Sequence, residues 1–266
     1  MSSELRINSV TPCQTQCNSV VNKEIKMRNL LLTSIAIFFL AVLSSNISGS
    51  DLSQSKRHKN NSLNILAIGD SNGALPEGWV TQLKKLRSND SIFNISVSGN
   101  TIGFYNNGRK SLNTLANIGA YMNKAYAKLG KIDIVIMMIG TNDCKSVFRD
   151  SLSVIPGNMK KLIDEIKLNV RIHKGKPLIF IVSPPPFGPD ELIGEKYAGG
   201  LNRVRQLNET LAALAADENI QFIDSFHILL PVFNTLSADG VHLIPDGQMM
   251  IARIIQENLK YFSKGR

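Results

Sequence analysis

Cysteine is scarce in this sequence, with three in 266 residues. Cys13 and Cys17 precede an apolar segment at residues 30–43, so the part of the chain after that segment contains only Cys144. A lone cysteine cannot form an internal disulfide and most often packs as a small hydrophobic residue, which is our interpretation of Cys144. Without a cysteine pair or two histidines at helical spacing in that part, a zinc site has little to build on, and we expect neither a metal nor a cofactor.

Aromatic residues are also few, at 6% of the chain. Of the formal net charge of +9, the first 62 residues contribute +4, because they hold 7 of the 30 Lys and Arg residues but only 3 of the 21 Asp and Glu residues. The remaining chain is only mildly basic and has no basic run with interleaved aromatics. A nucleic-acid-binding surface is therefore not expected.

No apolar run reaches the roughly 20 residues that a helix needs to cross a bilayer. The longest, Leu30–Leu43, has 14 residues, follows Lys26 and Arg28, and precedes small polar residues at positions 44–50. This pattern is typical of a signal peptide and predicts an exported protein, periplasmic or secreted, whose mature chain starts near Asp51. An uncleaved membrane anchor is the alternative. Met27 is the expected true start, which N-terminal mass analysis of the precursor tests.

The chain divides into an N-terminal extension with the signal segment (1–50), a polar linker (51–62) and one domain (63–266). Runs rich in β-branched residues predict five strands, separated by segments with apolar residues at helical spacing. This alternation predicts an α/β fold with a five-stranded parallel sheet. The predicted strands are Ile65–Ile68, Ile92–Val97, Ile132–Ile139, Leu178–Val182 and Ile220–Ile223; the predicted helices centre on residues 79–86, 112–126, 159–170, 201–214 and 249–261.

Parallel sheets place functional sites at the carboxyl ends of their strands, so the residues that follow each strand carry most information. Three predicted strands are followed by polar, glycine-containing segments, and a fourth such segment precedes the last helix. These segments are Gly69–Asn72, Ser98–Thr101, Gly140–Asp143 and Asp239–His242.

The four segments contain the parts of a serine hydrolase. A serine attacks an ester only if a base takes its proton, an acid orients that base and donors meet the developing oxyanion. Ser71 is the candidate nucleophile, His242 the base and Asp239, three residues earlier, the orienting acid. The backbone N–H groups of Ser71 and Gly99, with the Asn142 side-chain amide, are the candidate oxyanion hole.

The blocks GDSN, SGN, GTND and DGVH resemble the four signature blocks of the SGNH/GDSL hydrolases, in the same order, over residues 63–262. The stretches around IVIMMIGTNDCKSVFR and IVSPPPF are most similar to the arylesterase and acyltransferase branch. The resemblance implies a flavodoxin-like three-layer α/β/α sandwich and metal-free carboxylic ester hydrolysis. It also maps the family's Ser, Gly, Asn and His onto Ser71, Gly99, Asn142 and His242. Asn72 departs from the family, which usually has Leu there, and leaves the acyl preference open.

Each block has a structural explanation when it is taken alone. Gly-Asp-Ser can be a helix N-cap, Gly99 a turn residue, Asn142 a cap and Asp239-Gly240 a plain turn. Residues 69–73 also match the G-x-S-x-G elbow of α/β-hydrolases, but that fold places its serine deeper in the sheet and its acid far from its histidine. Of the other histidines, we expect His227 to be structural, and we assign no catalytic role to His58 or His173.

We therefore expect a serine esterase that removes a short acyl group, with acetyl as the expected one, from an alcohol or carbohydrate. Loops at residues 104–109 and 187–200 are expected to shape its pocket. Thioesterase, lysophospholipase and acyltransferase activities use the same residues and stay open, as does an inactive carbohydrate-binding protein on the same scaffold. The oligomeric state stays open too, and a membrane contact is expected only if the N-terminal segment is not cleaved.

Overall fold

The computed structural model describes residues 62–263, and in this part the chain forms one parallel sheet. The strand order is β2-β1-β3-β4-β5, the doubly wound order of flavodoxin-like folds. The predicted α/β fold and five-stranded parallel sheet are confirmed. The strands are β1 (Asn64–Gly69), β2 (Ser91–Asn94), β3 (Ile134–Met138), β4 (Leu178–Val182) and β5 (Gln221–Ile223). The expected signal segment, His58 and all but the last residue of the linker lie outside the described residues.

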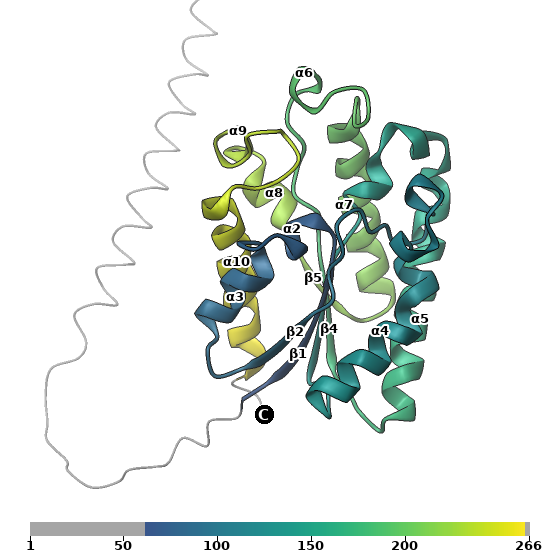
Figure 1. Ribbon diagram of the computed structural model, residues 1–266, viewed down its shortest axis with the longest axis vertical. Helices are drawn as coiled ribbons and strands as arrows, with labels where there is room; N and C mark the ends of the chain where they lie inside the picture. Colours follow the sequence, from purple (N-terminus) through teal and green to yellow (C-terminus); the bar gives the residue numbers. More distant parts are fainter. Residues whose placement is uncertain (1–61, 264–266) are drawn as a thin grey trace, which may run out of the picture. The chain divides into compact units, whose positions relative to one another are not determined.

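Helices cover both faces of the sheet and complete three layers (Figure 1). One face carries α3 (Trp79–Leu86) and α10 (Pro245–Ser263). The other carries α4 (Thr114–Leu129), α5 (Ile155–Ile172) and α7 (Gly200–Asp217). Short elements lie in the connections: α2 (Ser71–Ala74), η1 (Asn106–Gly108), η2 (Lys110–Leu112), η3 (Asn142–Cys144), η4 (Ser146–Val154), α6 (Asp190–Ile193), α8 (Ser225–Leu229) and α9 (Phe233–Leu236).

The central strand β3 shows why the sequence gives this layering. All five of its residues, IVIMM, are buried. Val135 and Met137 pack in the core beneath α4, α5 and α7, whereas Ile134, Ile136 and Met138 pack beneath α3 and α10. A strand that is covered on both faces needs apolar side chains at every position, which explains the missing polar alternation.

Among the element boundaries that differ from those predicted, two show local side-chain effects. Strand β2 ends at Asn94, three residues before the predicted end at Val97. Backbone hydrogen bonds to β1 continue past this end, from the Ile95 N–H to the Ala67 carbonyl (3.0 Å) and from the Val97 N–H to the Gly69 carbonyl (3.2 Å). The Asn94 side chain accepts a hydrogen bond from the Ser96 N–H (3.0 Å) and donates one to the Gly73 carbonyl (2.8 Å). Helix α10 starts at Pro245, before the predicted residue 249, because the fixed φ of proline suits the first turn of a helix.

Within residues 62–263, no helix combines the length and the apolar character that a membrane span requires.

Candidate active site

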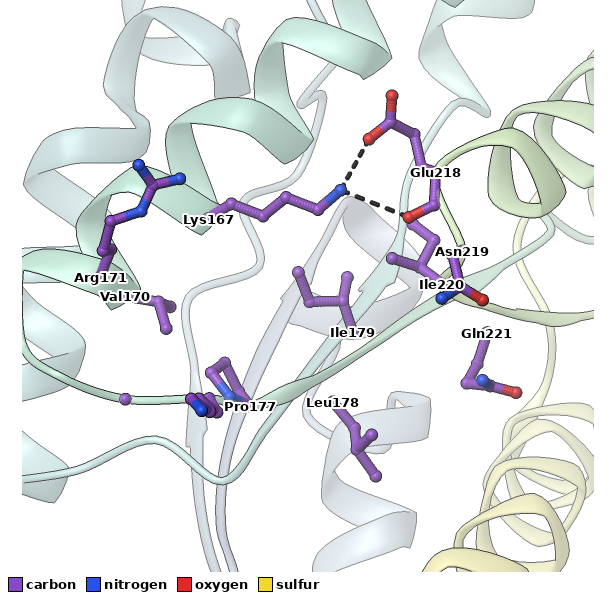
Figure 2. A pocket seen from close by; sticks show the side chains of 12 residues that line it. Lys167, Val170, Arg171, Pro177, Leu178, Ile179, Glu218, Asn219, Ile220 and Gln221 are labelled. Atoms are coloured by element: carbon purple, nitrogen blue, oxygen red, sulfur yellow. Dashed lines mark hydrogen bonds and ion pairs between the residues drawn. The ribbon is translucent and has the colours of Figure 1, made fainter.

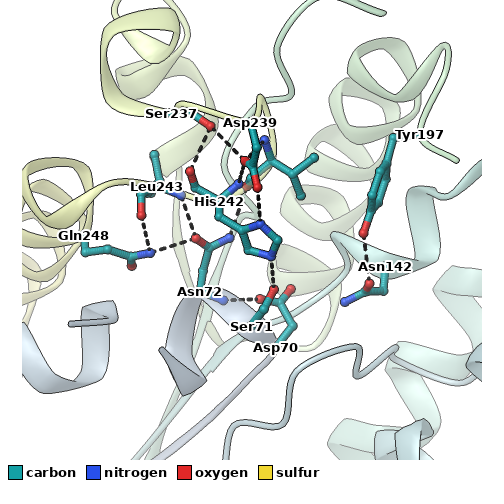
Figure 3. A network of polar contacts seen from close by, with 11 residues as sticks. Asp70, Ser71, Asn72, Asn142, Tyr197, Ser237, Asp239, His242, Leu243 and Gln248 are labelled. Carbon is teal, nitrogen blue, oxygen red and sulfur yellow. Dashed lines mark hydrogen bonds and ion pairs between the residues drawn. The ribbon is translucent and has the colours of Figure 1, made fainter. Parts of the chain in front are cut away.

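The nucleophile candidate Ser71 lies at the turn from β1 into α2. The buried Asp70 carboxylate caps this short helix by accepting a hydrogen bond from the Asn72 N–H at 3.0 Å. The Gly-Asp-Ser segment therefore does cap a helix, as its alternative structural explanation expects, and the capping residue is Asp70 and not Ser71. Ser71 remains 9% exposed, and its side chain is directed toward His242 (Figure 3).

His242 bridges Ser71 and Asp239 (Figure 3). Its Nε2 lies 2.9 Å from Ser71 Oγ and its Nδ1 lies 2.6 Å from Asp239 Oδ2. The three side chains that the sequence singled out therefore form one hydrogen-bonded chain, although 171 positions separate Ser71 from His242. This is the order of contacts through which a histidine takes a proton from a serine.

Asp239 is fixed by its own backbone as well as by the imidazole. Its Oδ1 accepts the N–H groups of Val241 (2.9 Å) and His242 (2.7 Å). Partial burial by itself raises the pKa of Asp239, but the hydrogen bonds from His242 and Val241 outweigh it and hold this pKa below the usual carboxyl value. Asp239 is therefore a carboxylate at neutral pH, as the orienting acid must be.

The predicted oxyanion donors, Ser71, Gly99 and Asn142, belong to three different segments of the chain. Gly99, between β2 and η1, has φ of +87°, a left-handed conformation that favours glycine. Among the described residues, neither its N–H nor that of Ser71 has a hydrogen-bond acceptor. One N–H of the Asn142 amide is held by the Asn100 carbonyl at 3.0 Å, which leaves its other N–H available.

Tyr197 orients Asn142, and the sequence analysis did not identify it. The Tyr197 hydroxyl donates to Asn142 Oδ1 at 3.4 Å, which directs the amide nitrogen away from it (Figure 3). Burial, together with the negative charges of Asp70 and Asp239, raises the pKa of Tyr197 to about 12, so the phenol stays a neutral donor. Tyr197 belongs to the 187–200 loop, which the sequence linked to the pocket only as a whole.

Asp143 binds the backbone of the loop that follows Gly99. Both of its carboxyl oxygens accept the Ile102 N–H, at 3.0 and 2.9 Å. Asp143 is fully buried, and this desolvation raises its pKa to about 8. Cys144, next in sequence, is also fully buried, as expected; burial raises the pKa of its thiol and makes it a poor nucleophile.

Asn72 connects α2 to the segment that carries His242. Its Oδ1 accepts the Leu243 N–H (3.0 Å) and Gln248 Nε2 (2.8 Å), and its Nδ2 donates to the Val241 carbonyl (3.4 Å). The side chain is completely buried, so it cannot contact a substrate in this structure. Where the family usually has Leu, this chain therefore has a buried amide that joins two segments.

We expect the substitution Asn72→Leu to destabilise the fold by about 2–4 kcal/mol, because it leaves the Leu243 N–H and the Gln248 amide without this buried acceptor. The turnover number should fall as well, since His242 is adjacent to Leu243, whereas KM should change little. Denaturant unfolding and ester kinetics measure the two effects. Asn123→Leu, at an exposed position on α4, is the matched control. Equal stability of the two variants would contradict this role.

A second histidine has similar contacts and tests the assignment of His242. His227 Nδ1 lies 2.7 Å from Asp224 Oδ2, again across three residues, and 3.3 Å from Asn208 Nδ2. No serine of the described residues contacts this ring, which packs edge-on against Phe226. His173 stacks on Tyr126 with ring centroids 3.6 Å apart. The Ser71 contact therefore distinguishes His242.

A hollow of about 400 Å³ lies at the opposite edge of the sheet, where β4 and β5 begin (Figure 2). Lys167 crosses it to pair with the Glu218 carboxylate at 2.6 Å. None of the catalytic candidates lines this hollow. It is therefore separate from the site around Ser71.

The sequence model of the GDSL-like Lipase/Acylhydrolase family matches residues 66–250, which include all of the candidate residues described above. The chain belongs to this family. Its reaction class is therefore carboxylic ester hydrolysis, and the resemblance of the four blocks is confirmed. The α/β-hydrolase alternative does not fit a nucleophile that follows β1 in this strand order.

Several solved structures share the fold at low sequence identity. Est24, a carbohydrate acetylesterase from Sinorhizobium meliloti, is 22% identical with a TM-score of 0.61, and the match covers 76% of this chain and 100% of that chain. The M. smegmatis aryl esterase is 20% identical with a TM-score of 0.61, covering 75% and 99%. A lipase/acylhydrolase from Enterococcus faecalis is 17% identical with a TM-score of 0.54, covering 74% and 96%. No curated protein sequence matches this chain significantly.

Proposed function

We propose that this GDSL-family protein is a serine esterase that removes a short acyl group from an alcohol or carbohydrate. The observation that carries the proposal is the position of the His242 ring, 2.9 Å from the Ser71 hydroxyl on one side and 2.6 Å from the Asp239 carboxylate on the other. The neighbours described as a carbohydrate acetylesterase and an aryl esterase support the choice of substrate class.

Acylation of the enzyme follows from these contacts. Ser71 Oγ attacks the ester carbonyl carbon while His242 Nε2 accepts the hydroxyl proton, and Asp239 stabilises the imidazolium that forms. The carbonyl oxygen becomes an oxyanion that the N–H groups of Ser71, Gly99 and Asn142 meet. The C–O bond to the alcohol then breaks, and His242 gives its proton to the departing oxygen. The product is an acyl-Ser71 ester.

Deacylation repeats these steps with water as the nucleophile. His242 takes a proton from water, the resulting hydroxide attacks the acyl-Ser71 carbonyl, and the proton returns to Ser71 Oγ as the acid leaves. An alcohol in place of water would give acyl transfer with the same residues. Product analysis with an added alcohol distinguishes the two outcomes.

We expect Asn142→Ala to lower kcat by about 10²–10³, equivalent to roughly 3–4 kcal/mol, because one preorganised oxyanion donor is lost. KM should change little, since the donor acts mainly on the charge that develops in the transition state. Steady-state kinetics on 4-nitrophenyl acetate measure both constants. Tyr197→Phe, which removes only the hydrogen bond to Asn142 Oδ1, should have a smaller effect of the same kind. A change confined to KM would contradict the oxyanion role.

The proposed substrate class is tested with a series of 4-nitrophenyl esters from acetyl to decanoyl, together with acetylated xylan. The fold neighbour described as a carbohydrate acetylesterase supports a short acyl group. We therefore expect kcat/KM to be highest for acetyl and to decrease as the chain lengthens. A maximum at octanoyl or decanoyl would overturn the short-acyl proposal and favour lysophospholipase activity.

We also infer that the enzyme acts outside the cytoplasm. The support is the sequence of Leu30–Leu43 with its basic flank, which lies outside the described residues. Such a location is compatible with acetylated polysaccharides as substrates.

A further inference from the structure

A cavity of about 620 Å³ lies beside the active site and takes no part in the chemistry proposed above. Three segments line it: the loop containing Tyr105, the residues that follow η3, and the loop containing Lys196. The loops at residues 104–109 and 187–200, which the sequence analysis expects to shape a pocket, thus both line this cavity. Its walls combine apolar side chains, including the exposed Tyr105 and Val147, with two lysines, Lys145 and Lys196.

Lys145 is in an unusual environment for a lysine. It is only 3% exposed, and its ammonium donates a hydrogen bond to a neutral acceptor, Asn106 Oδ1, at 2.9 Å. The Lys196 side chain lies next to it, and the two ammonium groups are 5.8 and 5.3 Å from the centre of the Tyr197 ring. Burial and the neighbouring Lys196 charge lower the pKa of Lys145 to about 8.

No carboxylate of the described residues forms an ion pair with either lysine. Glu195 lines the same cavity but is not paired with them, and the buried carboxyl groups of Asp70 and Asp143 affect Lys145 electrostatically without forming an ion pair with it. Two adjacent ammonium groups, one of them buried, repel each other, and an anion bound between them would relieve that repulsion. The cavity they line is large enough to hold one.

Two contacts connect the cavity to the oxyanion donors. Asn106, which accepts from Lys145, donates through Nδ2 to the Gly99 carbonyl at 2.6 Å. Tyr197, whose ring lies against both lysines, donates to Asn142. Asn106 therefore connects Lys145 to Gly99, and Tyr197 connects both lysines to Asn142. Because only one residue lies between the lysines and each oxyanion donor, a group bound between the lysines would be close to the ester that reacts with Ser71.

We propose that this cavity is a subsite for an anionic group of the substrate, a carboxylate or a phosphate on an apolar or sugar body, bound by Lys145 and Lys196. The inference rests on the proposed esterase function and narrows its substrate class to acidic esters. The aromatic and aliphatic walls contact the body, and the two lysines contact the anion.

A pair of acetyl esters that differ in charge tests the subsite. 4-Acetoxybenzoate carries a carboxylate on its alcohol part, 4-acetoxybenzamide is the neutral match, and 4-acetoxyphenyl phosphate tests whether phosphate is preferred. Mono-4-nitrophenyl adipate and 4-nitrophenyl hexanoate place the charge difference on the acyl part instead. We expect wild-type kcat/KM to be higher for the anionic member of at least one pair, and the better pair identifies the side that carries the anion.

The test variants are Lys196→Gln, which alters an exposed side chain, and Lys145→Gln. The control is Lys128→Gln at an exposed position near the end of α4, which changes the net charge of the protein by the same amount. We expect Lys196→Gln to lower kcat/KM for the preferred anionic ester on the order of tenfold and for its neutral match less than about twofold. The control should leave both unchanged. Equal losses on the charged and neutral esters, or no loss on either, would overturn the subsite.

Direct binding separates this inference from the esterase proposal. Calorimetry with the Ser71→Ala variant compares 4-hydroxybenzoate, 4-hydroxybenzamide and inorganic phosphate, with and without Lys196→Gln. Binding of an anion that weakens about tenfold in the lysine variant supports the subsite even if no ester is hydrolysed, an outcome that would refute only the esterase. Ester hydrolysis that depends on Ser71 but is indifferent to the lysines refutes only the subsite.

Discussion

The Ser71→Ala variant is expected to lose on the order of 10⁴-fold or more in kcat on 4-nitrophenyl acetate, because removing the nucleophile disables the whole triad. The fold should persist. The change removes one oxygen from a side chain that is 9% exposed, and the α2 cap comes from Asp70, which is unchanged. Thermal unfolding of the two proteins should therefore differ little.

Ser225 provides the control for this serine. It is buried and donates to the Ser183 carbonyl, so Ser225→Ala should reduce stability while leaving the turnover number of the folded protein near the wild-type value. A Ser71→Ala variant that keeps more than about a tenth of wild-type activity, far above the expectation for a triad nucleophile, would show that another group attacks the ester.

His242→Ala should be about as damaging as the serine variant near neutral pH, because the general base is lost. Asp239→Asn keeps the shape but cannot stabilise the imidazolium, and a loss of up to about 10⁴ is known for this change in a serine protease. We expect a smaller loss here. The N–H groups of Val241 and His242 that bind Asp239 Oδ1 hold the turn in place after the substitution.

The chain contains a matched control for this pair. Asp224 and His227 have the same three-residue spacing and a similar 2.7 Å contact but no serine partner among the described residues, so His227→Ala and Asp224→Asn should leave kcat near wild type. Equal losses at His227 and His242 would contradict the assignment.

The pKa of Asp239 lies below the usual carboxyl value in the folded protein. Its contribution to folding stability is therefore fully present above the usual carboxyl pKa and is lost as the pH falls through the lowered pKa.

The parts of the site that the sequence predicts are those that follow strands. Ser71, Gly99 and Asn142 each come shortly after a β-rich run, and parallel strands end at one edge of the sheet, so their proximity follows from the fold class. His242 is recognisable because Asp239 precedes it by three residues. Helix and strand types follow from apolar periodicity, as β3 shows with its continuous run of buried residues.

The parts that the sequence misses depend on contacts between distant loops. Nothing in the local sequence indicates that Tyr197 reaches Asn142, 55 residues away, or that Asn72 binds Leu243 across 171 residues. The local sequence around Lys145 does not distinguish it from a surface lysine, but in the folded protein it is buried beside Asn106. Such contacts are set by how loops pack at the sheet edge, which periodicity does not describe.

Labelling with a fluorophosphonate tests the central claim most directly, because the reagent reacts with a serine only when a base has activated it. We predict one adduct per chain by intact mass, mapped to Ser71 by peptide sequencing. It should be absent from Ser71→Ala, strongly slowed in His242→Ala and unchanged in His227→Ala. Folded wild-type protein that takes no label, or takes it at a different serine, would contradict a catalytic unit made of Ser71, His242 and Asp239.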